Sequence, residues 1–171
     1  MANTVLTGLA ASSLSTAKVL VLGSMPGTVS LKQQQYYAHP RNLFWPIMAN
    51  LVGFSAEASY SAKLQALNAA GVALWDVIGH CQRSGSLDSA IRNEQVNDFA
   101  SFFTVQPNLQ VIAFNGAKAW QSFNRHVLSK QPLPAKLILF QLPSTSPAHA
   151  AMGFPEKLAQ WQQLKSFIVK N

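Results

Sequence analysis

The sequence predicts an α/β fold, a three-layer sandwich in which a four-stranded, mostly parallel central sheet is flanked by helices. Four short runs of consecutive apolar residues are typical of strands that are buried on both faces. Longer segments with helical spacing of apolar residues separate these runs, and this alternation favours a parallel sheet. No repeat, low-complexity stretch or linker interrupts the chain, so we expect a single domain over residues 1–171.

The first half of the chain is expected to hold two strands and two helices. The predicted elements are, in order, a strand over KVLVLGS (18–24), a long loop over 25–42, a helix over 43–53 that Asn42 caps and Gly53 ends, a helix over 60–70, and a strand over VALWDV (72–77). A loop as long as 25–42 is uncommon in a compact domain unless it serves a function.

The second half opens with a polar segment over 79–93, for which we expect irregular structure. The elements predicted after it are a helix over 98–104 capped by Asn97, a strand over LQVIAF (109–114), a helix over 117–128, a strand over KLILFQ (136–141), a Pro/Ser loop, and a closing helix over 155–170.

Composition and charge narrow the class of protein. Hydrophobic residues make up 49% of the chain and charged residues 11%, which excludes a disordered chain. The net charge of +7 favours a polyanionic partner such as nucleic acid, the alternative being a basic protein with no such partner. A single cysteine, Cys81, allows no internal disulfide and suits the cytoplasm. The N-terminus lacks signal-peptide features, and we expect no membrane association because no apolar run is long enough to span a bilayer.

Ligands of open parallel sheets bind beyond the carboxyl ends of the strands. Four polar segments follow the predicted strands there: GSMPG (23–27) with the long loop, Asp76 onward, Asn115-Gly116, and LPSTSPAH (142–149). GSMPG has neither the GxGxxG spacing of a dinucleotide site nor the GK[ST] of a P-loop. The histidines and Cys81 show no metal-ligand spacing, and Ser144 and Ser146 lack the G-x-S-x-G elbow of a catalytic triad. What remains is aromatic rings, amides and a rigid backbone, a set that suits recognition of a planar base.

These residues carry a resemblance to a known family. GSMPG, then YYAHPRNLFW (36–45), then LPSTSPAH resemble, in this order, the motifs of the uracil-DNA glycosylase superfamily. HPRN-x-FW and PSTSPA are most similar to the hypoxanthine-DNA (deoxyinosine) glycosylase branch. The resemblance covers residues from about 18 to 165.

The resemblance implies hydrolysis of an N-glycosidic bond without a metal or cofactor, with DNA that contains a deaminated base as the partner. It implies that Asn42 is catalytic and that Tyr37 stacks on the flipped base, with Asp76 at a position where relatives place an asparagine that reads the base edge. The base-binding residues that we expect are Gly23, Ser24, Met25, Tyr37, Asp76 and Asn115. The DNA-binding residues that we expect are Pro26, Gly27, His39, Arg41, Ser144, Thr145, Ser146 and His149. We expect a monomer, because flipping one nucleotide needs no symmetry, in the cytoplasm and at the nucleoid while it acts on DNA.

Two positions depart from the mismatch-specific pattern. Met25 stands where those enzymes have the catalytic asparagine of GxNPG, which moves the catalytic role to Asn42. Asp76 lacks the N–H donors of asparagine, and an ionised carboxylate accepts a hydrogen bond from a ring N–H. Hypoxanthine has such an N–H at N1 and uracil at N3, so this position favours hypoxanthine without deciding between the two.

Each role has a structural alternative. Asn42 is also a helix cap, Tyr37 a packing ring, Asp76 a buried structural acid, and Asn115-Gly116 a turn. Lys32 and Arg41 could contact phosphate groups, but solvated surface charge explains them equally well. Lys118 is the nearest candidate for the lysine of a lyase reaction, and a charge on the helix surface explains it better. Three functions therefore stay open: a hypoxanthine glycosylase, a uracil or mismatch glycosylase, and a DNA- or nucleotide-binding module without chemistry.

Overall fold

The central sheet has four strands, all parallel, in the order β3-β2-β6-β7. The computed structural model describes residues 4–168. The strands are β2 (Val19–Gly23), β3 (Val72–Asp76), β6 (Val111–Asn115) and β7 (Ile138–Leu142). Each predicted strand is present: β2 and β6 are buried along their whole length at the centre of the sheet, whereas β7, at its edge, is buried only in part. The predicted four-stranded parallel sheet is confirmed.

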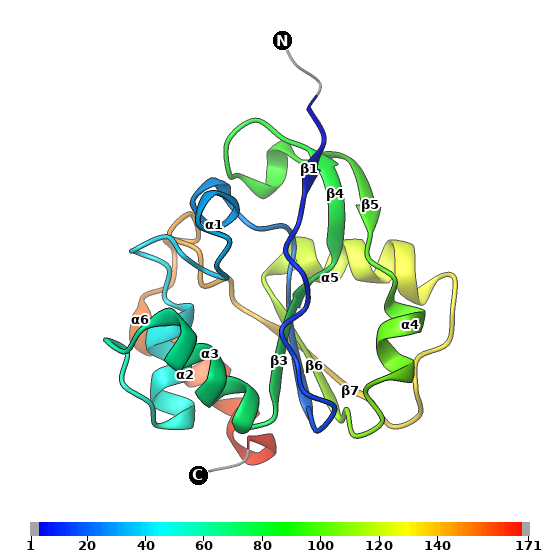
Figure 1. Ribbon diagram of the computed structural model, residues 1–171. Helices are drawn as coiled ribbons and strands as arrows, with labels where there is room; N and C mark the ends of the chain where they lie inside the picture. The colour runs from blue at the N-terminus through cyan, green and yellow to red at the C-terminus, as the bar shows by residue number, and fades with distance from the viewer. Residues whose placement is uncertain (1–3, 169–171) are drawn as a thin grey trace.

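Helices cover both faces of this sheet (Figure 1). Val19 and Val21 of β2 pack in one hydrophobic cluster, whereas Leu20 and Leu22 pack in the other, because successive side chains of a strand point to opposite faces. The first cluster lies under α2 (Phe44–Val52), α3 (Tyr60–Ala69) and α6 (Phe154–Trp161). The second lies under α4 (Phe99–Thr104) and α5 (Ala117–Phe123). The result is the expected three-layer sandwich.

The polar segment at 79–93 is not irregular, and the prediction for it was wrong. It forms β4 (Ile78–Gln82), a 3-10 turn over Asp88–Ala90, and β5 (Arg92–Val96). With the two-residue β1 (Leu6–Thr7), these strands make an antiparallel sheet of order β1-β4-β5. Its inner side packs Ile78, Cys81 and Ile91 around Met25 in a third, small cluster. Apolar side chains are too few in this segment to give a strand pattern in the sequence.

The long loop at 25–42 contains a short helix, α1 (Thr28–Gln33), that the sequence analysis missed. Gly27 is its N-cap without a side-chain hydrogen bond, so no capping side chain announced it. Ser30 connects α1 to the part of the loop that follows it, since its hydroxyl accepts a hydrogen bond from the Ala38 amide at 3.0 Å.

The helix ends test the predicted caps. Gly53 ends α2 as expected, but the N-cap is Leu43, and the side-chain Oδ1 of Asn42 accepts from the Phe44 backbone amide at 2.9 Å. Asp98 rather than Asn97 caps α4, because its carboxylate accepts from the Ser101 amide at 3.1 Å.

The last two predicted helices are present with altered ends. α5 continues as a π-helical turn over Asn124–Leu128, and α6 continues as a 3-10 helix over Gln162–Phe167. The closing helix was predicted to reach residue 170, and positions 169 and 170 lie outside the described residues. Within residues 4–168, no helix has the length and apolar character that crossing a membrane requires.

Phe44 provides a test of the core beneath the long loop. This ring is fully buried, stacks on Tyr37 and meets Trp45 and Trp161 edge to face. We expect Phe44→Ala to lower the free energy of unfolding by about 3–5 kcal/mol, as measured by urea denaturation. Phe54→Ala, at a half-buried ring of the same cluster, is the control and should cost clearly less. Equal losses for the two variants would contradict this account of the core.

Candidate active site

A cavity of about 990 Å³ opens at the carboxyl ends of the parallel strands. It lies where polar segments follow β2, β3, β6 and β7, as expected for a sheet of this kind. All the site residues expected from the sequence line it: Gly23, Ser24, Met25, Pro26, Gly27, Tyr37, His39, Arg41, Asn42, Asp76, Asn115, Ser144, Thr145, Ser146 and His149. The structure therefore brings together positions up to 126 residues apart in the chain.

Gly23 lies at the inner end of the cavity, where space is tightest. It pairs in register with Asp76 across β2 and β3. A Cβ atom at position 23 would lie 2.5 Å from Asp76 Oδ1 and 3.1 Å from the Tyr37 hydroxyl. Contacts this short leave no room for a side chain while Asp76 and Tyr37 keep their positions, so glycine allows the carboxylate and the phenol to approach the backbone.

Asp76 is a buried acid, with 3% of its surface exposed. Its backbone carbonyl accepts from the Asn97 side chain at 2.7 Å, but its Oδ2 atom has no hydrogen-bond partner among the described residues. Burial raises the pKa of Asp76 to about 7; the nearby Asp88 carboxylate adds to this, and Arg83 opposes it. The carboxyl group therefore changes charge near neutral pH.

Tyr37 has one ring face packed on the protein. Its ring stacks on Phe44 with 4.1 Å between centroids and 25° between planes. Its φ angle of 53° is in the left-handed region, which is uncommon for a side chain of this size. The hydroxyl group is buried without a hydrogen-bond partner, although Asn115 lies near enough to lower its pKa slightly. Burial, reinforced by the charge of Asp76, raises the pKa of Tyr37 well above its ordinary value.

The neighbouring Tyr36 has a purely structural position. Its hydroxyl donates to the Ala10 carbonyl at 2.6 Å, and its own carbonyl accepts from the Trp45 indole at 2.9 Å. Its amide donates to the Tyr60 hydroxyl at 3.0 Å. These bonds fix the backbone that carries Tyr37.

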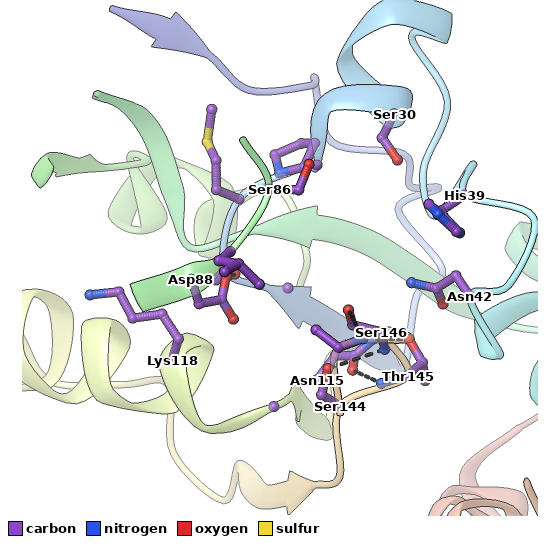
Figure 2. Close-up of a pocket in the computed structure, with 18 of the residues that line it drawn as sticks. Ser30, His39, Asn42, Ser86, Asp88, Asn115, Lys118, Ser144, Thr145 and Ser146 are labelled. Carbon is purple, nitrogen blue, oxygen red and sulfur yellow. Dashed lines mark hydrogen bonds between the residues drawn. The ribbon is translucent and has the colours of Figure 1, made fainter. Parts of the chain in front are cut away.

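Asn42 lines the cavity and also supports the start of α2. Its carbonyl oxygen accepts from the Phe44 amide, while Figure 2 shows its amide nitrogen directed into the cavity. The backbone before it forms a tight turn. There the backbone N–H of Asn42 donates to the His39 carbonyl at 2.9 Å, and the backbone N–H of Arg41 donates to His39 Nδ1 at 3.1 Å. The cap role and a role in the cavity are therefore compatible.

Asn115 joins the end of β6 to the Pro/Ser loop. Its amide nitrogen donates to Thr145 Oγ1 at 3.0 Å, and its carbonyl oxygen accepts from the Thr145 amide at 2.9 Å (Figure 2). The next residue, Gly116, has φ of 95°, and a Cβ there would lie 3.1 Å from Ser144 Cβ. Both residues thus position the loop that follows β7.

The same loop is held from behind by two side chains that sequence reasoning did not select. Lys157 of α6 is 2% exposed, and its ammonium group donates to the His149 carbonyl at 2.8 Å. Burial lowers the pKa of this lysine. Trp161 donates its indole N–H to the Pro143 carbonyl at 3.0 Å. No sequence signal identifies these contacts, because a lysine in an amphipathic helix is ordinarily a surface residue.

The turn between β4 and β5 forms the opposite wall of the cavity. The sequence offered Asp88 of this turn as a second, less favoured carboxylate beside Asp76, but it did not indicate the turn itself or Ser86. Ser86 Oγ accepts from the Thr28 amide at 2.8 Å, and Asp88 accepts from Ser24 Oγ at 2.6 Å. Arg83 donates to the Pro26 carbonyl at 2.6 Å. Figure 2 shows Ser86 and Asp88 across the cavity from His39 and Asn42. The turn reaches this place only through the pairing of β4 with β1 and β5.

Within residues 4–168, no group of three or more histidine, cysteine or carboxylate side chains is placed to hold a metal ion. Lys118, at the rim, is paired with Glu94 at 2.7 Å. The ammonium group of Lys118 is therefore held in a structural ion pair.

The fold and the cavity define an α/β protein whose ligand site lies beyond the carboxyl ends of a parallel sheet. The chain belongs to the uracil DNA glycosylase superfamily, whose family model matches residues 11–165. Two curated relatives named hypoxanthine DNA glycosylase, from Methanosarcina barkeri and Methanosarcina acetivorans, are 38% and 40% identical over 103 residues. The match spans 60% of this chain and 65% of each relative, which is less than two thirds of their length.

The fold has a solved counterpart. A Methanosarcina acetivorans protein that was solved by solution NMR, and provisionally described as a uracil DNA glycosylase, is 30% identical to this chain. It superimposes with a TM-score of 0.82 over 96% of this chain and 99% of its own. The expected family and its fold are confirmed.

The raised pKa of Asp76 predicts a pH-dependent stability. The folded-state pKa of about 7 exceeds the ordinary 3.8, so the stabilising contribution is full below pH ~4 and is lost as the pH rises to ~7. Asp76→Asn does not titrate, and we expect its loss of unfolding free energy between pH 4.5 and 8 to be smaller than that of the wild type by ~2–4 kcal/mol. Urea denaturation at both pH values measures this.

The exposed Glu57→Gln is the matched control for the change of charge and should retain the wild-type pH dependence. Asp88 and Arg83 are the charged groups that shift the pKa of Asp76, and Tyr36 and Tyr37 are the titratable groups that its charge affects; all four are kept in both variants. An identical loss of stability in Asp76→Asn and wild type would rule out a buried, titrating carboxyl group at this position.

Proposed function

We propose that this protein is a monofunctional DNA glycosylase that hydrolyses the N-glycosidic bond of a deaminated base, with hypoxanthine as the favoured base. The observation that carries the proposal is the single cavity that gathers Tyr37, Asn42 and Asp76 at the sheet edge of a superfamily member. The two curated relatives named hypoxanthine DNA glycosylase support the choice of base. The reaction would form part of base excision repair.

The reaction requires little covalent chemistry from the protein. The C1′–N bond breaks, its electron pair goes to the departing base, and a water molecule adds to C1′ and supplies the proton that the base takes up. The side-chain Oδ1 of Asn42 accepts from the Phe44 backbone amide, which leaves the Nδ2 hydrogens of Asn42 to bond the water or the base. The Asp88 carboxylate at the cavity wall would place negative charge near the positive charge that develops on the sugar.

The walls of the cavity suit the DNA backbone. The Gly23–Gly27 loop and the Ser144–Ser146 loop both line it, and both are held by side-chain hydrogen bonds. Loops that are already ordered lose little entropy on binding. The net charge of +7 adds a general attraction for phosphate groups.

Uracil is the second candidate base. Its ring N3–H can donate to the Asp76 carboxylate as the N1–H of hypoxanthine can, and the structural relative solved by NMR carries the description of a uracil enzyme. Incubation of duplexes that contain inosine, uracil or xanthine, followed by hot alkali, identifies the excised base through cleavage at the abasic site. Failure to cleave any of these duplexes would contradict the proposed activity.

Asn42→Ala should lower the single-turnover rate of excision by ~10²–10³-fold, because the amide that contacts water or base is lost. The free energy of unfolding should fall by no more than about 1 kcal/mol, since only one cap-like hydrogen bond disappears. Asn50→Ala, at an exposed asparagine of α2, is the control and should keep full activity. An active Asn42→Ala enzyme would leave Asn42 with its structural role alone.

Leu87 is the exposed apolar residue at the rim, with 57% of its surface exposed. Its neighbour Asp88 accepts a hydrogen bond from Ser24, and its neighbour Ser86 accepts one from the Thr28 amide. These bonds hold the backbone of Leu87 in place, while its side chain is exposed to solvent. An apolar side chain in this position suits insertion into the base stack that an extruded nucleotide leaves.

Leu87→Ala should therefore lower the excision rate on duplex DNA by roughly 10-fold or more, and should leave the rate on single-stranded DNA nearly unchanged. Val105→Ala, at a side chain 60% exposed and outside the cavity, is the matched control. Equal effects of Leu87→Ala on both substrates would contradict insertion.

A further inference from the structure

Lys157 of α6 carries a buried charge that no described carboxylate neutralises. Its side chain is 2% exposed, and burial lowers its pKa. Within residues 4–168, both ion pairs involve Glu94, so the ammonium group of Lys157 has no acidic partner there. A buried charge without a counter-charge ordinarily destabilises a fold, and lysine is therefore seldom buried unless it is paired. Its retention at this position points to a role other than packing.

The ammonium group is bonded to the backbone of the Pro/Ser loop. It donates to the His149 carbonyl at 2.8 Å and, more weakly, to the Ser146 carbonyl at 3.5 Å. Trp161, one turn further along α6, donates to the Pro143 carbonyl at 3.0 Å. Ser146 and His149 line the cavity, whereas Lys157 does not. Three carbonyl groups of the loop are thus bonded on the side of α6, behind the wall of the cavity.

The serine hydroxyl groups of the same loop have a different set of partners. Ser144 Oγ accepts from the Ser146 amide at 3.2 Å, and Ser146 Oγ accepts from the Ala148 amide at 3.1 Å. Each oxygen is thereby used as an acceptor, and its O–H remains available to donate to a ligand. Both serines line the cavity. Donors on the cavity side and carbonyl groups on the α6 side suit an anion, and serine hydroxyls commonly bond DNA phosphate groups.

We propose that Lys157 is a positioning residue for DNA binding, which acts through the loop rather than by contact with DNA. Its ammonium group holds the Ser146 and His149 carbonyls on the α6 side, so that the serine hydroxyls are presented to a phosphate group. A carbonyl turned into the cavity would instead meet the phosphate oxygens acceptor to acceptor. The charge behind the loop also attracts the phosphate, since a buried charge is little screened by salt. The inference rests on the proposed function and deepens it, because it names DNA phosphate groups as the partner of this loop.

Lys157→Met tests this role, because it keeps the length and the apolar stem of the side chain and removes the ammonium group. In fluorescence anisotropy, we expect this variant to bind duplex DNA about 10-fold more weakly, with or without inosine in the duplex. In single-turnover excision, the enzyme concentration at half-maximal rate should rise by a similar factor. The maximal rate should stay within ~3-fold of the wild type, since the loop binds the DNA backbone and not the reacting bond.

Lys165→Met is the matched control, because it makes the same change of charge at an exposed position outside the cavity. It should bind duplex DNA within ~2-fold of the wild type. Thermal melts define the temperature range in which each variant is folded. Lys157→Gln, which keeps one N–H donor, takes the place of Lys157→Met if the latter does not fold, and should weaken binding by ~3-fold or more.

A double-mutant cycle with Ser146→Ala separates positioning from a general loss of stability. If Lys157 acts by presenting the Ser146 hydroxyl, the double variant should bind DNA little more weakly than the weaker of the two single variants. Two effects that multiply would overturn the inference. Wild-type affinity of a folded Lys157 variant would overturn it as well, and so would a lower maximal rate at unchanged affinity, which would place Lys157 in the chemical step.

The two proposals fail in different ways. If duplex binding depends on Lys157 but no lesion duplex is cleaved, the positioning role stands and the glycosylase activity falls. If hypoxanthine is excised with an affinity and a maximal rate that Lys157→Met leaves unchanged, the activity stands and the positioning role falls.

Discussion

The register of β2 against β3 is the constraint on which the site depends. Because the two strands are parallel and end together, Gly23 lies beside Asp76 at the carboxyl edge of the sheet. The missing side chain at position 23 is what allows the carboxylate and the Tyr37 phenol to reach the backbone there. A slip of one residue would turn Asp76 to the other face of the sheet and close this end of the cavity.

The other walls of the cavity are held in place by hydrogen bonds from polar side chains, which come from the two sheets and from α6. Asn115 fixes the Pro/Ser loop through Thr145, and the buried ammonium group of Lys157 fixes the same loop from behind. On the opposite side, Arg83 and Ser86 fasten the turn of the small sheet to the GSMPG loop and α1. The cavity is therefore preorganised, and little ordering remains to be done when a ligand binds.

The sequence predicts the central sheet and the place of the site because both follow from short-range signals. Apolar runs define β2, β3, β6 and β7, and polar residues that follow such strands must meet at one edge. The small sheet could not be predicted, since β1 has two residues and pairs with β4 across more than 70 positions. The contacts of Asn115, Lys157 and Asp88 depend on that tertiary arrangement, and so does the stacking of Tyr37 on Phe44.

Asp76 is a buried acid whose ionisation destabilises the folded protein. Above a pH of about 7 the buried carboxyl group is ionised, and no described residue donates a hydrogen bond to its Oδ2 atom. By linkage, the fold therefore loses stability as the pH rises towards about 7. The acid lies beside Gly23 because β2 and β3 end together, so the register that builds the inner end of the cavity also places this destabilising charge there.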